Sequence, residues 1–433
     1  AVYSDIEKTG YFESSNELLT KIVDCTVWSQ KNNFLDVPTD CPTRERHGWT
    51  GDIQIFYKTA QYLFDSQTFI KKYLKDVYDL QYKNGNLPQI APYGGTDFYM
   101  KTMDGSVGWA DVGVLIPYRM WKQCTDRSVL EQYYDGMRAY AEFMISRVGK
   151  GTDDKKTMAG LNEIGRKYAV NKVQSYGEWA EPEDVHAMDF MEMGKPHPEV
   201  STAYTAYVLG VMAEISEELG HKDDAEHFKS YSENCKKAYQ NMRTLPQFSL
   251  DTNRQAELVR PLYMNLLDEE QTEYAKKRLI KALDDYNWRL GTGFLSTPLI
   301  LYVLADMDIE LAYKLLKNEE MPGWLFMPKM GATTIWESWE GEYGQGGIAS
   351  MNHYSKGACV EWLCTTMCGI NVDGMNHFVI APKPGGDFEY AKASYDSVFG
   401  HVEAGWKLEG EEYKYRVTVP ANCRATVILP GGD

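Results

Sequence analysis

The sequence of 433 residues predicts a mainly α-helical protein, in which an (α/α)6 barrel is followed by a small antiparallel β-sandwich domain. Two observations support this prediction. Before Gly369, apolar residues recur at helical spacing in about twelve successive segments. After Gly369, apolar and polar residues alternate, which is typical of strands with one buried face. We therefore expect a barrel domain over residues 1–369 and a β domain over residues 370–433.

The helical segments are recognised by the spacing of their apolar residues. In residues 127–148, for example, Leu130, Tyr133 and Met137 follow one another at intervals of three and four. Gly220 supplies a stop signal after a second clear helix. The other predicted helices cover residues 15–29, 52–65, 67–82, 109–123, 200–219, 223–240, 253–266, 269–286, 295–306, 308–318 and 352–368.

The order of these helices predicts how they pack. Helices joined by short turns pack as antiparallel neighbours, so successive helices should form hairpins. Six hairpins can close into a ring whose inner helices surround a central cleft. An open solenoid of hairpins is the alternative. The sequence shows no repeat at a fixed period, which favours the closed ring.

The final part of the chain predicts short strands. Val402, Ala404 and Trp406 alternate with polar residues, and residues 413–419 show the same period of two. A last strand is expected at residues 426–429. A segment of this length can form a small antiparallel sheet that packs one face on the barrel.

Four long irregular stretches separate the predicted helices. Each contains Trp, Tyr or a carboxylate beside Gly or Pro, and together they cover residues 30–50, 84–108, 150–198 and 320–351. Compact domains rarely contain such long loops without a functional reason, and sites are usually built on loops held by a rigid scaffold. We therefore expect the functional residues in these stretches.

The charge and the hydropathy of the chain restrict its partners. With 45 Lys and Arg against 62 Asp and Glu, the net charge is -17, which repels phosphate backbones and argues against a nucleic-acid partner. No stretch approaches the roughly 18 consecutive apolar residues of a membrane span, so no membrane partner is expected. The polar start of the sequence contains no signal-peptide core.

The eight cysteines are scattered among apolar neighbours. Cys364 and Cys368 lie four residues apart, but no second pair has the spacing of a metal site. We interpret the cysteines as reduced core residues, which favours a cytoplasmic location. No cofactor and no metal are expected.

The densest group of reactive side chains lies within residues 40–52, DCPTRERHGWTGD. Its carboxylates are Asp40, Glu45 and Asp52, and its Pro and Gly residues prevent a continuous helix. One interpretation is a helix entry with Asp52 in the first turn. The other is a carboxyl group whose pKa is raised by neighbouring carboxylates, so that it donates a proton at neutral pH.

A second group surrounds Glu337, which lies between Trp336 and Trp339 in GATTIWESWE. Alone, this carboxylate could be a surface group beside core tryptophans. Together with the first group it predicts chemistry, because hydrolysis of a glycosidic bond needs two carboxyl groups. A third group contains His353, which could be either a structural histidine or a site residue.

These segments resemble the α-L-rhamnosidases of glycoside hydrolase family 78. DCPTRERHGWTGD is similar to the signature segment of that family, and GATTIWESW and SMNHYSKGACVEWL are similar to two further family segments in the same order. The segments GNLPQIAP, VGWADVGVLIPY and TGFLSTP are similar as well, so the resemblance covers nearly the whole chain.

The resemblance implies an (α/α)6 barrel with a β-sandwich tail, and release of terminal α-L-rhamnose from a rhamnose-containing oligosaccharide or glycoside, with inversion at the anomeric carbon. It assigns the general acid to Glu45 and the general base to Glu337, which an inverting enzyme holds about 6.5–9.5 Å apart. It also implies sugar contacts for Asp40, Arg44, Trp49, Asp52, Trp109, Glu178, Trp179, Trp336 and His353.

The sequence departs from the family in two respects. Residues 176–181 read YGEWAE, where the family has Gly-Asp-Trp, so Glu178 replaces an Asp. Family members are also usually longer, with β-domains before the barrel, so such N-terminal β-domains are possible partners. Three alternatives remain: a phosphorylase on the same ring of helices, a hydrolase for a related deoxy sugar or uronic acid, and a carbohydrate-binding fragment without activity.

Overall fold

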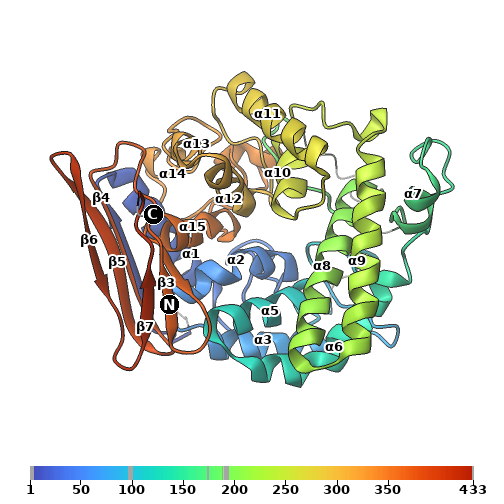
Figure 1. Ribbon diagram of the computed structural model, residues 1–433, viewed down its shortest axis with the longest axis horizontal. Helices are drawn as coiled ribbons and strands as arrows, with labels where there is room; N and C mark the ends of the chain where they lie inside the picture. The colour runs from blue at the N-terminus through green and yellow to red at the C-terminus, as the bar shows by residue number, and fades with distance from the viewer. Residues whose placement is uncertain (1–3, 96–100, 173–174, 188, 190–194, 432–433) are drawn as a thin grey trace.

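A computed structural model describes residues 4–95, 101–172, 175–187, 189 and 195–431. The described chain forms a body of helices with β-strands gathered on one side (Figure 1). The predicted fold class is confirmed, because the helical elements precede Gly369 and the strands other than β1 (Gly10–Ser14) follow it.

The helices of the inner ring pack against one another, and α2 is buried on nearly every face. Helix α2 packs against α5 and η3, α5 packs against α8, and α12 packs against α10 and η3. Helices α8 and α10 are joined by an ion pair between Glu199 and Arg260. The elements of this ring are α2 (Thr50–Leu63), α5 (Val112–Cys124), α8 (Pro198–Leu219), α10 (Gln255–Tyr263), α12 (Thr297–Met307), η3 (Ser355–Cys359) and α15 (Val360–Trp362).

The outer helices are amphipathic and cover the ring. Helix α3 buries only Ile70, Tyr73, Leu74 and Val77, which lie on one face at a spacing of three and four. Each of α5, α8, α10 and α12 packs against the helix that follows it, so these four of the six predicted hairpins are present in the described part of the chain. The outer helices are α1 (Glu17–Asn33), α3 (Gln67–Asp79), α6 (Arg127–Ile145), α9 (Lys222–Met242), α11 (Glu269–Asp285) and α13 (Ile309–Leu316).

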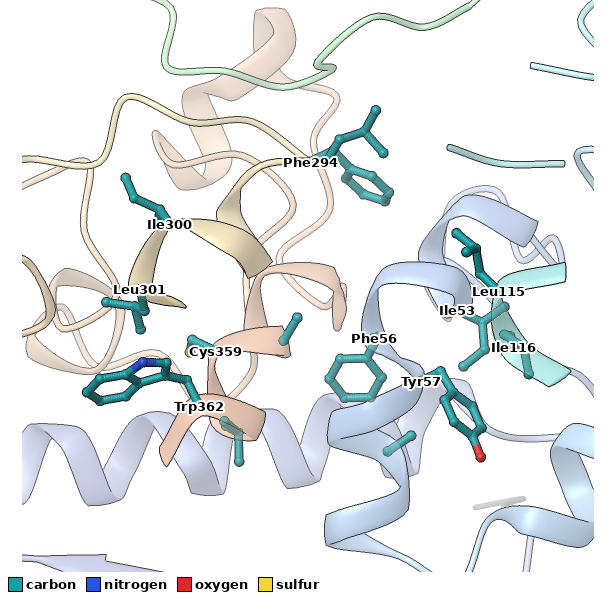
Figure 2. Close-up of a cluster of buried hydrophobic side chains, with 14 of the residues drawn as sticks. Ile53, Phe56, Tyr57, Leu115, Ile116, Phe294, Ile300, Leu301, Cys359 and Trp362 are labelled. Atoms are coloured by element: carbon teal, nitrogen blue, oxygen red, sulfur yellow. The ribbon is translucent and has the colours of Figure 1, made fainter. Parts of the chain in front are cut away.

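The inner helices meet in an apolar core (Figure 2). Phe56 of α2, Leu115 of α5 and Ile300 of α12 are fully buried, and Trp362 of α15 lies in the same cluster. Burial of large apolar side chains of this kind provides most of the favourable free energy of folding. The core thereby fixes the positions at which the inner helices begin.

The last predicted helix, residues 352–368, is shorter and less regular than expected. It begins at Ser355 as the 3-10 helix η3, continues as α15 and ends as the π-helix η4 (Leu363–Met367). The residues before it bind a distant loop instead, because His353 N–H donates to the carbonyl of Ile335 at 2.8 Å. Short helices in the other irregular segments are α7 (Glu163–Tyr168), η1 (Pro246–Phe248), α14 (Phe326–Lys329) and η2 (Gly341–Gly347).

The strands form two sheets in the described part of the chain. One has the order β1-β4-β5-β6 and is antiparallel; the other has the order β2-β3-β7, in which β3 and β7 are parallel. The strands predicted near residues 402–408, 413–419 and 426–429 correspond to β5, β6 and β7. The strands are β1 (Gly10–Ser14), β2 (Ile370–Val372), β3 (His377–Ile380), β4 (Tyr390–Ser397), β5 (Gly400–Glu409), β6 (Glu412–Thr418) and β7 (Arg424–Val427).

Strand β1 was not predicted, since its five residues are too short to signal a strand alone. It forms because β4 supplies a partner from the other end of the sequence: Phe12 lies opposite Ala393. The sheets are also anchored to the helices, because Trp406 of β5 donates its indole N–H to the carbonyl of Met367 at 2.9 Å.

All eight cysteines lie in described residues, and all are free thiols; six of them are buried. Among the described helices, none combines the length and the apolar composition that crossing a lipid bilayer requires.

Candidate active site

Several predicted site residues lie at the end of the barrel where the inner helices begin. Asp52 is in the first turn of α2, Trp109 precedes α5, and His353 precedes η3. The free N–H groups of a helical first turn carry a partial positive charge, which favours a negative side chain beside them. This end of the ring can therefore hold several carboxylates close together.

The loop that carries Glu45 is closed on itself by Asp40. The Asp40 N–H donates to the carbonyl of His47 at 3.0 Å, and the His47 N–H donates to Asp40 Oδ1 at 2.9 Å. Gly48 then passes so close to the backbone of Ala91 that an added Cβ would lie 2.0 Å from its carbonyl oxygen. A larger residue at position 48 would displace the loop.

Trp49 orients Glu45 directly. Its indole Nε1–H donates to Glu45 Oε2 at 2.7 Å. The Glu45 side chain reaches solvent on one side, while the surrounding protein removes part of the water from its carboxyl group. This loss of water and the negative charge of Asp40 raise the pKa of Glu45 to about 7, against the opposing effect of the Trp49 hydrogen bond.

Smaller contributions to the raised pKa of Glu45 come from the charges of Glu337 and Asp52. Glu337 lies 292 positions after Glu45 in the sequence. The fold therefore brings the two predicted catalytic carboxyl groups close enough for the charge of one to affect the other.

Glu337 is buried and held by two donors. Its Oε1 accepts a hydrogen bond from the Gln345 side-chain amide at 3.0 Å, and its Oε2 accepts one from the Ser350 backbone N–H at 2.6 Å. The backbone of Glu337 also donates to the carbonyl of Ser350 at 2.9 Å. A carboxylate with two fixed donors is held in one orientation.

Asp52 and His353 form a buried pair, with His353 Nε2 3.0 Å from Asp52 Oδ1. Ser355 Oγ lies 2.9 Å from the other ring nitrogen, Nδ1. Burial alone would lower the pKa of His353, but the charge of Asp52 and its hydrogen bond raise it to about 9. Burial also raises the pKa of Asp52 to about 6, against the effect of His353. At neutral pH the pair is therefore ionic.

Aromatic rings surround these acidic groups. Trp49 meets Tyr176 edge-on with ring centroids 6.0 Å apart, and Tyr176 lies 4.6 Å from Trp109 and 5.8 Å from Trp179. Trp109 also stacks on Phe294 at 5.5 Å. The predicted Trp49, Trp109 and Trp179 thus form one connected group, and Tyr176 is its centre.

Two of these aromatic residues were not predicted as site residues. Tyr176 and Phe294 belong to the segments YGEWAE and TGFLSTP, which were singled out only as whole segments. The Gln345 and Ser350 donors were also missed, because nothing in the local sequence marks the residues that contact Glu337.

Family models match the whole of the described architecture. The bacterial alpha-L-rhamnosidase six-hairpin glycosidase domain matches residues 7–367, and the bacterial alpha-L-rhamnosidase C-terminal domain matches residues 371–433. The chain belongs to the bacterial α-L-rhamnosidase family.

Relatives in the α-L-rhamnosidase family are similar over nearly all of this chain. An alpha-L-rhamnosidase of Formosa agariphila is 31% identical over 99% of the chain. The structure of the Streptomyces avermitilis alpha-L-rhamnosidase complexed with L-rhamnose matches 98% of the chain at 30% identity with a TM-score of 0.83. The structure of the Aspergillus terreus α-L-rhamnosidase matches 99% at 29% identity with a TM-score of 0.84.

The α-L-rhamnosidase relatives are longer than this chain. The chain covers 45% of the Formosa agariphila protein, 39% of the Streptomyces avermitilis structure and 49% of the Aspergillus terreus structure.

The remaining residues that the α-L-rhamnosidase resemblance singled out are Glu178, Trp336 and Arg44. Glu178 lines a cavity beside Tyr176 and Trp179, and its carboxylate is held by three contacts: Arg260 contacts Oε2 at 2.5 Å, and Ser296 donates its N–H to Oε1 at 2.6 Å and its hydroxyl to Oε2 at 2.8 Å. Trp336 is buried edge-on against Phe326 with centroids 6.1 Å apart. Arg44 is exposed on the loop of Glu45.

A cavity of ≈ 230 Å³ adjoins the aromatic group of this α-L-rhamnosidase family member. Tyr176 and Trp179 line one side, and Arg254 and Glu257 of the α10 region line another. Among the described residues, no group of three or more His, Cys, Asp or Glu side chains is arranged to hold a metal ion.

Proposed function

We propose that this chain is the catalytic part of an inverting α-L-rhamnosidase that releases terminal α-L-rhamnose from a glycoside or oligosaccharide. Glu45 is the general acid that protonates the departing glycosidic oxygen. Glu337 is the general base that takes a proton from a water molecule on the opposite face of the sugar.

The observation that carries this proposal is the position of the Glu45 carboxyl group, which Trp49 orients through a 2.7 Å hydrogen bond and whose pKa is raised to about 7 in a group of residues that includes Glu337. A general acid must be protonated when substrate binds and must lose its proton during the reaction, so a pKa near the working pH is the best compromise. The cause is partial removal of water followed by the charge of Asp40, and the Trp49 hydrogen bond holds the carboxyl group in place.

The surroundings of Glu337 suit the complementary role. Gln345 and the Ser350 N–H hold both oxygens of its carboxylate, which fixes the orientation that a base needs. The negative charges of Asp40 and Asp52 would stabilise the oxocarbenium-like transition state, which is positive. The aromatic group of Trp49, Trp109 and Trp179 offers apolar surface for the methyl group that rhamnose carries at C5.

The experiment compares Glu45→Gln and Glu337→Gln on two α-L-rhamnosides, one with a p-nitrophenyl leaving group and one with an alkyl leaving group. Loss of a general acid or base slows turnover by roughly 10²- to 10⁴-fold. For Glu45→Gln the loss should be much larger with the alkyl glycoside, because p-nitrophenolate departs without protonation. For Glu337→Gln both substrates should be slowed equally, and added azide should restore turnover with formation of β-rhamnosyl azide.

NMR of the first-formed sugar tests the stereochemistry. An inverting enzyme releases β-L-rhamnose from an α-glycoside, and release of the α-anomer would disprove the assignment. Exposed Glu342 lies near Glu337 on the same loop, so Glu342→Gln is a matched control that should keep wild-type rates. Turnover that requires phosphate would indicate a phosphorylase, and rhamnoside binding without turnover would indicate a binding module.

A further inference from the structure

Lys356 is a buried cation beside the candidate base. Its residue is 1% exposed, in the 3-10 helix η3. A buried charge is costly unless polar groups or counter-charges compensate it, so its surroundings indicate what it does. The residue lies three positions after His353 but was not predicted as a site residue.

The ammonium group of Lys356 contacts two loops of the candidate site. Its Nζ donates to the carbonyl oxygen of Glu337 at 2.5 Å, and to the carbonyl oxygen of Ala180 at 3.5 Å. The first contact fixes the peptide group of the base itself, and the second reaches the residue after Trp179. The same Nζ lies 4.8 Å from the centre of the Trp339 ring, an additional cation–π contact.

In the described part of the chain, Lys356 makes no direct ion pair with a carboxylate. The charged groups that face it are Glu337 and Glu340 from one loop and Glu178 from the other. Glu178 is already occupied by Arg260. Burial lowers the pKa of Lys356 to about 8 against the effect of these three carboxylates, so the side chain remains largely charged at neutral pH.

We propose that Lys356 is a positioning residue for the base, which ties the loop of Glu337 to the loop of Trp179 and supplies a positive charge that acts on the Glu337 carboxylate. Lys356 does not touch the reacting atoms in this role. The inference rests on the proposed function, because it assumes that Glu337 is the base.

The geometry separates the two parts of the role. The contact of Lys356 with the carbonyl of Glu337 helps to orient the side chain of that residue. Its contact with the carbonyl of Ala180 helps to position the neighbouring Trp179. The charge acts through space on the carboxylate. A purely structural lysine would account for the hydrogen bonds but would have no effect on the protonation of the base.

The test is the pH profile of kcat for hydrolysis of p-nitrophenyl α-L-rhamnoside by the wild type, Lys356→Met and Lys356→Gln. Lys356→Met removes both the hydrogen bonds and the charge, and we expect kcat to fall roughly 10- to 100-fold, while KM changes less. The acidic limb, which reports protonation of the base, should move upward by roughly 0.5–1 pH unit.

Lys356→Gln keeps a donor for the Glu337 carbonyl but removes the charge. We expect it to recover part of the lost kcat and to show the same displaced acidic limb. If Lys356→Met does not fold, the pH profile of Lys356→Gln still tests the effect of the charge. The control is Lys58→Met, which removes a lysine that pairs with Glu361 at 2.8 Å in the barrel. Its acidic limb should coincide with that of the wild type.

Glu337→Gln separates failure of this inference from failure of the proposed function. If Glu337→Gln is inactive while both Lys356 variants keep the wild-type acidic limb, the charge of Lys356 has no role and the inference is wrong. An unchanged kcat in Lys356→Met would exclude the positioning role in the same way. If Glu337→Gln keeps full activity, the base itself is assigned wrongly and both proposals are overturned.

Discussion

The indole N–H of Trp49 donates a 2.7 Å hydrogen bond to Glu45 Oε2, and this bond opposes the effects that raise the pKa of the carboxyl group. Trp49 therefore acts on Glu45 in two ways. It orients the carboxyl group, and it limits how far the partial loss of water and the charge of Asp40 raise the pKa of Glu45.

Trp49→Phe should shift the alkaline limb of the pH–rate profile to higher pH. The hydrogen bond favours the charged form of Glu45, so its removal raises the pKa of Glu45 above about 7 and keeps the acid protonated to higher pH. The check is kcat/KM for an α-L-rhamnoside between pH 5 and about 10, with an expected displacement of roughly one unit. A limb that moves to lower pH, or not at all, would show that Glu45 does not control it.

His353→Gln should destabilise the protein more at pH 7 than at about pH 10. The folded-state pKa of His353 is raised to about 9, above the ordinary value of about 6.5. Its contribution to stability is therefore fully present below about pH 6.5 and is lost as the pH rises through about 9. Urea unfolding at both pH values should show the difference between wild type and variant shrinking by roughly 1–3 kcal/mol. Equal differences at the two pH values would contradict an ionic pair with Asp52.

Much of the fold follows from local sequence, because an amphipathic helix carries its own signal. The outer helix α3 buries Ile70, Tyr73, Leu74 and Val77 at helical spacing, and this pattern is legible without any neighbour. Strand β1 cannot be predicted in this way, because Phe12 is in a strand only through its pairing with β4. The same limit explains the start of η3, because the backbone hydrogen bond of His353 depends on Ile335.

The candidate site shows the same division. Asp40, Glu45 and Asp52 are close in sequence, so their chemistry could be predicted from one segment. Tyr176 and Lys356 could not, because their importance comes from contacts with Trp49 and Glu337 that only the closed ring creates. Residue identity therefore indicates candidate reactive groups, whereas the fold determines which side chains surround them.

Glu178→Gln distinguishes a structural role for this residue from the sugar contact that the resemblance implies. Loss of its charge leaves Arg260 with one carboxylate, Glu199, in a buried site. Breaking a buried pair in this way costs about 3–5 kcal/mol. We expect a large fall in stability by urea unfolding, with KM for an aryl rhamnoside within about threefold of the wild type for the folded fraction. A large rise in KM with unchanged stability would instead support direct sugar binding.

Trp406→Phe tests how the β-strands are fastened to the barrel. The indole N–H of Trp406 donates to the carbonyl of Met367, the last residue of η4, and both residues are buried. Phe keeps the ring in the core but leaves that carbonyl without its donor, which costs about 1–3 kcal/mol. The matched control is Tyr413→Phe, because Tyr413 packs against Trp406 at 5.5 Å but is 38% exposed, so its hydroxyl is not needed in the core. Equal unfolding midpoints for the two variants would show that the Trp406–Met367 hydrogen bond does not hold the sheet. A lower midpoint in Trp406→Phe alone, with a single transition, would show that the strands and the helices unfold together.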